Sequence, residues 1–216
     1  MIKENLKQRI LTSFFLIILI YFIYTYKSIL VFSLIVLGVL SLIEFFNISK
    51  RIFNTKFYEL LINFFFIIYI FSFCFVFIFF SNFLILKLII FLLLIACITS
   101  DIGGFIFGKI LKGPKLTKIS PKKTISGSFG SIFLTCLIFS GLVFYLINIF
   151  NIKIMAISIV TSIACQSGDL LFSFLKRCAK IKDTGNLLPG HGGILDRIDG
   201  ILLGIPIGLT AFIILY

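Results

Sequence analysis

Aspartate is scarce in this chain of 216 residues, and most of it is concentrated in one stretch. The only histidine, His191, lies in that stretch, and a fifth aspartate, Asp101, precedes a lysine-rich segment. Oxygen ligands gathered in this way are typical of sites for divalent cations. The stretch is therefore a candidate metal site, and its aspartates are Asp169, Asp183, Asp196 and Asp199.

The spacing of these aspartates leaves two interpretations open. Asp196 and Asp199 flank Arg197, and on a helix a spacing of three places both carboxylates on one face, where they repel unless a cation lies between them. A divalent metal would supply that cation. Alternatively, the aspartates neutralise basic neighbours in a solvated loop, as Asp183 would do beside Lys182. Asp169 ends an apolar run, where a charged carboxylate is costly unless it is paired or bound to a cation.

A second polar segment, Gly108–Lys123, contains six lysines and no acid. Its lysines could set the orientation of a membrane protein and contact anionic headgroups. They could also bind a polyphosphate, because Ser120-Pro121-Lys122-Lys123-Thr124 directly precedes a predicted helix whose first N–H groups attract anions. The residue order differs from GxxxxGK[ST], which excludes a Walker loop.

These segments resemble the phosphatidate cytidylyltransferase (CDP-diacylglycerol synthase) family. The strongest resemblance is in residues 173–199, which contain Ser-Phe-Leu-Lys-Arg, Lys-Asp-Thr-Gly and Leu-Pro-Gly-His-Gly-Gly-Ile-Leu-Asp-Arg-Ile-Asp. Residues 101–216 contain the remaining matches, and the first 95 residues resemble the family only as hydrophobic spans behind a basic N-terminus. These further matches are Asp101–Gly104, Phe107–Lys109, Ser120–Thr124 and Gln166–Leu170.

Several positions depart from the family pattern. Ser126 stands where a glutamate is common, Ser131 where a glycine is usual, Ile102 where a small hydroxyl residue follows the aspartate, and Gly200 where a serine is found. The chain is also shorter than is typical of the family. If the missing glutamate helps to hold a metal or a lysine, Ser126→Glu should modestly improve turnover. If the site has adjusted to serine, the new carboxylate should repel CTP.

The resemblance implies a reaction and a set of residues. Members of the family transfer CMP from CTP to phosphatidate, with Mg²⁺ or another divalent cation, and they release pyrophosphate. By motif position, Asp169 and Asp196 are the first candidates for metal ligands. Asp199 is a further catalytic candidate, as is His191 as a general acid or nucleotide contact, although a structural histidine is an equal alternative. The implied substrate contacts are Ser120, Lys122, Lys123, Thr124, Lys176, Arg177, Lys182, Asp183 and Arg197.

Two other classes of function fit the sequence less well. A CDP-alcohol phosphotransferase would require the DGxxAR pattern with more distant aspartates, and Asp196-Arg197-Ile198-Asp199 does not fit that spacing. A small carrier or channel would explain an intramembrane Asp169 but not the polar stretch 173–199, because transporters bind near the membrane midplane. The formal charge of +12 does not indicate nucleic acid, since the basic residues lie in short loops between apolar runs. A homodimer is compatible with the sequence.

The elements that position these residues are membrane helices. The chain is 60% hydrophobic and only 13% charged, against roughly 45–50% and 25% in soluble domains. This composition excludes soluble, disordered and disulfide-rich secreted classes, and its continuous apolar runs favour helices over a β-barrel. The five cysteines have no CxxC spacing and are expected to be small buried apolar residues.

We predict an all-α polytopic bundle of seven transmembrane helices, with an eighth at Ile102–Leu111 as the alternative. Residues 1–216 are expected to form a single membrane domain, in which spans within 1–100 precede a catalytic portion, 101–216, with cytoplasmic loops 109–124 and 173–200. The first span lacks a small-residue cleavage site and is not expected to be a signal peptide. The predicted spans are Ile10–Tyr26, Ile29–Asn47, Phe57–Phe80, Phe83–Thr99, Ile125–Phe150, Ile154–Phe172 and Ile201–Tyr216.

The basic residues predict the orientation. With the N-terminus in the cytoplasm, 17 of the 20 Lys and Arg residues fall in cytoplasmic segments, as the positive-inside rule requires. Only Lys27 and Lys153 lie in outside loops, and Lys87 lies within a span. We therefore expect an integral protein of the bacterial inner membrane, with its C-terminus outside and its active site facing the cytoplasm.

Overall fold

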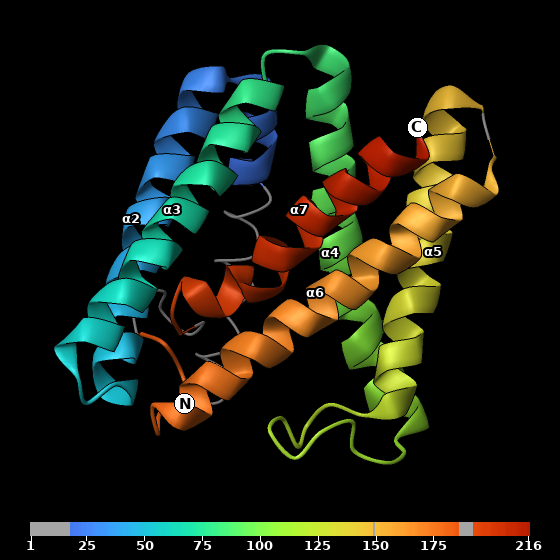
Figure 1. Cartoon of the computed structure of the whole chain (residues 1–216). Coiled ribbons are helices and arrows are strands. Elements are labelled where there is room, and N and C mark those ends of the chain that lie inside the picture. Colours follow the sequence, from blue (N-terminus) through green and yellow to red (C-terminus); the bar gives the residue numbers. More distant parts are fainter. Residues whose placement is uncertain (1–17, 149, 186–191) are drawn as a thin grey trace. The chain divides into compact units, whose positions relative to one another are not determined.

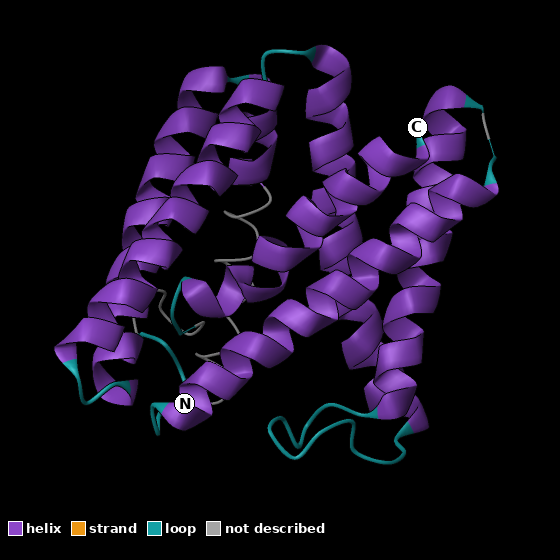
Figure 2. Cartoon of the chain, viewed as in Figure 1, coloured by secondary structure: helices purple, strands orange, loops and turns teal. Residues whose placement is uncertain are grey.

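The computed structural model describes residues 18–148, 150–185 and 192–216, and in this part of the chain every regular element is a helix (Figure 2). This confirms the predicted all-α class. Six helices in the described part are long and apolar enough to cross a membrane. They are α2 (Lys27–Ile52), α3 (Lys56–Phe80), α4 (Leu84–Leu111), α5 (Ile125–Ile147), α6 (Ile152–Cys178) and α7 (Leu195–Leu215).

These helices correspond to the last six predicted spans, whose ends are displaced by several residues. The predicted first span, Ile10–Tyr26, lies largely outside the described residues, although residues 18–25 are helical. The predicted cytoplasmic segments 109–124 and 173–200 include the ends of three helices. Because α4, α6 and α7 extend into them, the two connections are residues 112–124 and 179–194.

The alternative of a separate helix at Ile102–Leu111 is wrong, because α4 continues through these residues without a break. Its 28 residues correspond to a length of about 42 Å at 1.5 Å per residue, which exceeds a hydrocarbon core of about 30 Å. The Gly103-Gly104 pair does not interrupt the helix. Instead, the two glycines allow α4 to pack closely against α5. A Cβ atom on Gly103 would lie 2.7 Å from the carbonyl oxygen of Gly130 in α5.

The helices belong to two compact units that interleave along the chain. The first unit comprises Met1–Phe83 with Leu175–Arg197, and the second comprises Leu84–Phe174 with Ile198–Tyr216. The single membrane domain, with a catalytic portion in residues 101–216, stays a prediction. Helices α6 and α7 each contribute residues to both units.

In the first unit, α2 and α3 lie side by side (Figure 1). The ring of Phe45 stacks on that of Phe66, with centroids 3.7 Å apart and planes inclined by 13°. The hydroxyl of Ser49 donates to the amide oxygen of Asn63 at 2.7 Å. The outer faces of these helices expose large apolar side chains, including Phe64 and Phe71, and such faces are suited to contact with lipid.

In the second unit, small residues let the helices approach closely. In the pair α4 and α5, which lie side by side in Figure 1, Ser131 donates to the carbonyl of Ser100 at 2.7 Å. On α7, the row Gly200, Gly204 and Gly208 faces Cys165 and Thr161 of α6, and a Cβ on Gly200 would lie 2.6 Å from the sulfur of Cys165. Such rows of small residues are typical of packed membrane helices.

Candidate active site

The first unit contains a polar cluster around Asp196, which we call the Asp196 cluster. It comprises side chains at the end of α6, in the 179–194 connection and at the start of α7. Lys176 donates to Asp196 Oδ1 at 2.6 Å, while the backbone N–H groups of Thr184 and Gly193 donate to Oδ2 at 2.8 and 3.3 Å. The Asp196 carboxylate, on the first turn of α7, thus holds the 179–194 connection, which we call the motif connection.

A residue that sequence reasoning missed completes this cluster. Glu44 lies in the C-terminal third of α2 and is 2% exposed. Its carboxylate accepts hydrogen bonds from the N–H groups of Ile194 and Leu195, each at 2.9 Å, and from the hydroxyl of Thr184 at 2.6 Å. An acid within an apolar run is a signal in itself, because such residues are rare in membrane helices and face polar partners.

A polar pocket of about 370 Å³ adjoins this cluster. Asp183 is exposed and lines the pocket, and its neighbour Lys182 is also exposed. The other lining residues come from α2 and from the 179–194 connection. They are Asn47, Arg51, Ile181, Thr184 and Gly185. The pocket therefore places a guanidinium group of α2 next to the Lys-Asp-Thr-Gly segment.

The remaining predicted residues of this stretch occupy different environments. Arg177 is exposed, and its guanidinium donates to the carbonyl of Ile181 at 3.3 Å. Arg197 is exposed on the first turn of α7. Asp199 is 8% exposed, and its Oδ1 accepts a hydrogen bond from the N–H of Gly200 at 2.8 Å. The prediction for His191 concerns a residue outside the described part of the chain.

The second unit contains another polar cluster, which we call the Asp169 cluster. Lys123 forms an ion pair with Asp169 Oδ2, and Ser173 donates to Oδ1 at 3.3 Å. One turn before Asp169, Gln166 exchanges hydrogen bonds with Ser128 of α5. The lysine loop and the Gln-Ser-Gly-Asp segment of α6 are therefore in direct contact.

The Ser-Pro-Lys-Lys-Thr segment precedes a helix, as predicted. Thr124 is the N-cap of α5, and its side chain accepts a hydrogen bond from the N–H of Gly127 at 3.1 Å. The N–H of Ile125 donates to the carbonyl of Pro114. Because the protein itself satisfies these two donors, the helix end offers less to an anion than the sequence implied. Lys122 is exposed, while Ser120 is half-buried and its carbonyl accepts the N–H of Lys123.

Ser126 also has a defined contact. Its hydroxyl donates to the carbonyl of Lys112, directly after the end of α4, and lies 3.1 Å from the hydroxyl oxygen of Thr124. Lys112 has a φ of 51°, in the left-handed region. The serine therefore fixes the turn that begins the lysine loop.

The fit of a divalent cation differs between the two predicted ligands. Asp169 is 30% exposed, and its carboxylate has acceptor positions beyond those used by Lys123 and Ser173. Asp196 already accepts from Lys176 and two backbone N–H groups and lies 3.1 Å from the Thr184 hydroxyl, so a cation there would have to displace one of these donors. Among the described residues, no three His, Cys, Asp or Glu side chains gather where they could hold one metal ion. Metal ligation by Asp169 and Asp196 stays a prediction.

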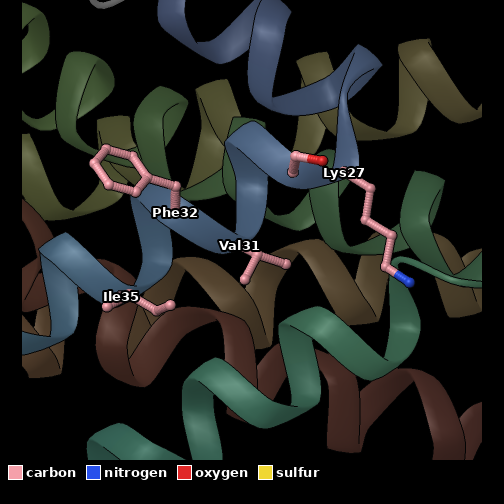
Figure 3. A pocket seen from close by; sticks show the side chains of 5 residues that line it. Lys27, Val31, Phe32 and Ile35 are labelled. Carbon is pink, nitrogen blue, oxygen red and sulfur yellow. The ribbon is translucent and has the colours of Figure 1, made fainter.

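A further pocket, of about 490 Å³, lies on α2 and is lined by residues from about two turns of that helix, between Lys27 and Ile35 (Figure 3). Val31, Phe32 and Ile35 give it an apolar wall, and Lys27 is its only charged residue. The ammonium of Lys27 donates to the amide oxygen of Asn82. The pocket contains none of the motif residues, and we do not assign it to the candidate site.

The described residues thus define a class: a helical integral membrane protein whose polar motifs pair lysine with aspartate. Residues 54–215 match the model of the Cytidylyltransferase family, so the chain belongs to that family. A phosphatidate cytidylyltransferase of Rickettsia bellii is 43% identical over 120 residues, which are 50% of each chain. One of Staphylococcus epidermidis is 42% identical over 126 residues, covering 56% of this chain and 47% of the relative. The chain spans about half the length of the curated relatives it matches.

Proposed function

We propose that this protein transfers CMP from CTP to phosphatidate, forming CDP-diacylglycerol and pyrophosphate. The observation that supports this proposal best is the similarity to phosphatidate cytidylyltransferases, at 37% to 43% identity in the relatives compared. The membrane-spanning character of the chain suits a reaction with one lipid substrate. The two polar clusters lie in the segments that resemble the family motifs.

In the proposed reaction, a phosphate oxygen of phosphatidate attacks the α-phosphorus of CTP. The bond from this phosphorus to the oxygen that bridges to the β-phosphorus breaks, and pyrophosphate leaves with that oxygen. Because both reactants are anions, fixed cationic groups that offset their repulsion lower the barrier. No covalent intermediate with the protein is required.

Several lysines of this chain would offset the repulsion between the two anionic substrates. Lys122, which is exposed, and Lys123, which Asp169 holds in place, would bind the triphosphate. In the first unit, Lys176, which Asp196 orients, is a further candidate for a phosphate contact. A bound Mg²⁺ would further neutralise the triphosphate, and Asp169 has the acceptor capacity to hold it.

The direct test uses purified protein in lipid nanodiscs with CTP labelled at the α-phosphate. We expect label in chloroform-soluble lipid only when phosphatidate is present, with one pyrophosphate released per lipid formed. A CDP-alcohol phosphotransferase would instead consume CDP-diacylglycerol and release CMP. Folded protein that incorporates no label from CTP would contradict the proposal.

Three finer predictions belong to the same proposal. Chelation should abolish the incorporation of label, and added Mg²⁺ should restore it if a divalent cation is required. The site should face the cytoplasm of a bacterial cell, since CTP is a cytoplasmic nucleotide. Assembly as a homodimer is a prediction that sedimentation of the nanodisc-embedded protein would check.

A further inference from the structure

Glu44 is a buried carboxylate that the proposed reaction does not use. It comes from α2, and it lies outside residues 54–215, which match the family model. Within the described part of the chain, Glu44 has no ion pair, and its hydrogen bonds all come from neutral donors. A charged group buried in a membrane helix costs several kcal/mol unless its partners are well arranged. The presence of Glu44 at this position therefore needs an explanation.

Each oxygen of this carboxylate has its own donor. Oε1 accepts from the N–H of Ile194 and Oε2 from the N–H of Leu195, both at 2.9 Å. These N–H groups belong to the N-terminal end of α7, where the helix leaves donors unsatisfied and attracts negative charge. Glu44 therefore fixes the helix end that bears Asp196.

Thr184 connects Glu44 to Asp196. Its hydroxyl donates to Glu44 Oε2 at 2.6 Å, and its backbone N–H donates to Asp196 Oδ2 at 2.8 Å. One residue of the motif connection is thus held by both carboxylates. A displacement of Glu44 would move Thr184, and with it a hydrogen bond that orients Asp196.

Two glycines of the family-like motif allow the backbone to approach the Glu44 carboxylate closely. A Cβ on Gly185 would lie 2.8 Å from Glu44 Oε1, and one on Gly193 would lie 2.6 Å from Oε2. Both distances are too short for a side chain to be added without displacing the carboxylate. The Lys-Asp-Thr-Gly and Gly-Gly segments accordingly provide the space that Glu44 occupies.

We propose that Glu44 is a positioning residue, which fixes the motif connection against α7 and orients Asp196 through Thr184. Its kinetic consequence rests on the proposed function, whereas its structural consequence does not. Glutamine at position 44 cannot replace the carboxylate, because one end of its amide would present N–H groups to a backbone N–H donor. Aspartate would keep the charge on a side chain shorter by one methylene.

The first test is hydrogen–deuterium exchange of the wild type and Glu44→Gln in nanodiscs. The amides of Thr184, Ile194 and Leu195 should exchange roughly tenfold faster or more in Glu44→Gln, since their acceptors are lost or displaced. Glu59→Gln is the matched control, because Glu59 lies on the first turn of α3, and it should leave these amides unchanged. Wild-type exchange at all three amides in Glu44→Gln would overturn the proposal.

The second test is kinetic. Glu44→Gln should lower kcat by roughly tenfold or more with little change in the KM for CTP, because misplaced groups weaken transition-state contacts more than binding. Glu44→Asp should recover part of this loss. Folded Glu44→Gln with the kcat of the wild type would overturn the proposal, and so would a loss of activity that only follows the folded fraction.

A third pair of variants decides the outcome if Glu44→Gln does not fold. Thr184→Val removes the hydroxyl that donates to Glu44 and also lies 3.1 Å from Asp196 Oδ2, but it leaves the Glu44 contacts with α7. Thr184→Ser keeps a hydroxyl. A lower kcat in Thr184→Val that Thr184→Ser largely restores supports the proposal, and equal kcat in all three proteins contradicts it. If the wild type forms no CDP-diacylglycerol while Glu44→Gln or Thr184→Val speeds exchange, the proposed function fails and the positioning role stands.

Discussion

At the scale of single residues, the pair of Lys176 and Asp196 is the most tightly constrained part of the candidate site. Their side chains are 11% and 10% exposed, and Lys176 Nζ lies 2.6 Å from Asp196 Oδ1. Asp196→Asn would leave the Lys176 charge without its carboxylate partner and would turn an amide N–H₂ toward other donors. We expect a loss of stability of about 3 kcal/mol together with loss of cytidylyl transfer, measured by denaturant unfolding and CTP incorporation.

Asp183→Asn is the matched control for that prediction. Asp183 is exposed and lines the polar pocket, so its substitution should change stability by less than about 0.5 kcal/mol. Equal stability of Asp196→Asn and the wild type would show that the carboxylate does not hold the motif connection in place. Equal loss in both variants would show a general effect of charge.

Ser126 yields a second prediction at this scale. Glutamate cannot donate a hydrogen bond to the carbonyl of Lys112, as the serine hydroxyl does, and its charge would face that carbonyl oxygen. We therefore expect Ser126→Glu to destabilise the loop by about 1–2 kcal/mol and to raise the KM for CTP. This favours the second of the two outcomes that the sequence left open. Ser126→Ala separates the lost hydrogen bond from the added charge, and improved turnover in Ser126→Glu would contradict the expectation.

At the scale of elements, glycines decide how closely α4 and α5 approach. A Cβ on Gly103 would lie 2.7 Å from the carbonyl oxygen of Gly130 and 3.0 Å from the Cα of Ser131. Both are backbone atoms, which cannot rotate away. We expect Gly103→Ala to separate the helices and to destabilise the protein by about 1–3 kcal/mol, measured as thermal unfolding in detergent.

Gly141 provides the control on the same pair of helices. A Cβ at this position of α5 would meet no atom within 4 Å. Gly141→Ala should therefore be neutral or stabilise by up to about 1 kcal/mol through helix propensity. If both variants unfold at the wild-type temperature, close packing at Gly103 does not limit stability.

At the scale of the whole molecule, the distribution of basic residues predicts the orientation in the membrane. Lys115 and Lys182 are exposed residues of the two motif connections, and both connections are predicted to be cytoplasmic. In a background without native cysteines, Lys115→Cys and Lys182→Cys should resist an impermeant thiol reagent in intact cells and react after lysis. Lys153→Cys, in a predicted outside loop, should react in intact cells. Labelling of position 115 or 182 from outside would overturn the orientation.

The sequence was sufficient for the fold class and for most helices, because long apolar runs admit few backbone solutions in lipid. It placed a helix directly after Thr124. It proposed Asp169 and Asp196 as metal ligands but did not predict their ion pairs with Lys123 and Lys176. It could not tell that α4 continues through Gly103 and Gly104. The glycines in a single sequence look like a break, and only their contact with α5 makes them part of a continuous helix.

The sequence by itself determined that the protein is a helical membrane protein with motifs of the cytidylyltransferase family, since composition and local pattern suffice for both. Only the tertiary structure decided which groups meet. Lys123 pairs with Asp169, which lies 46 positions later in the sequence. Glu44 accepts hydrogen bonds from Thr184 and from the start of α7, more than 130 positions later. Such pairings depend on helix packing, because a buried charge is tolerated only where the fold brings donors to it. The spacing of residues along the chain does not predict which helices pack together.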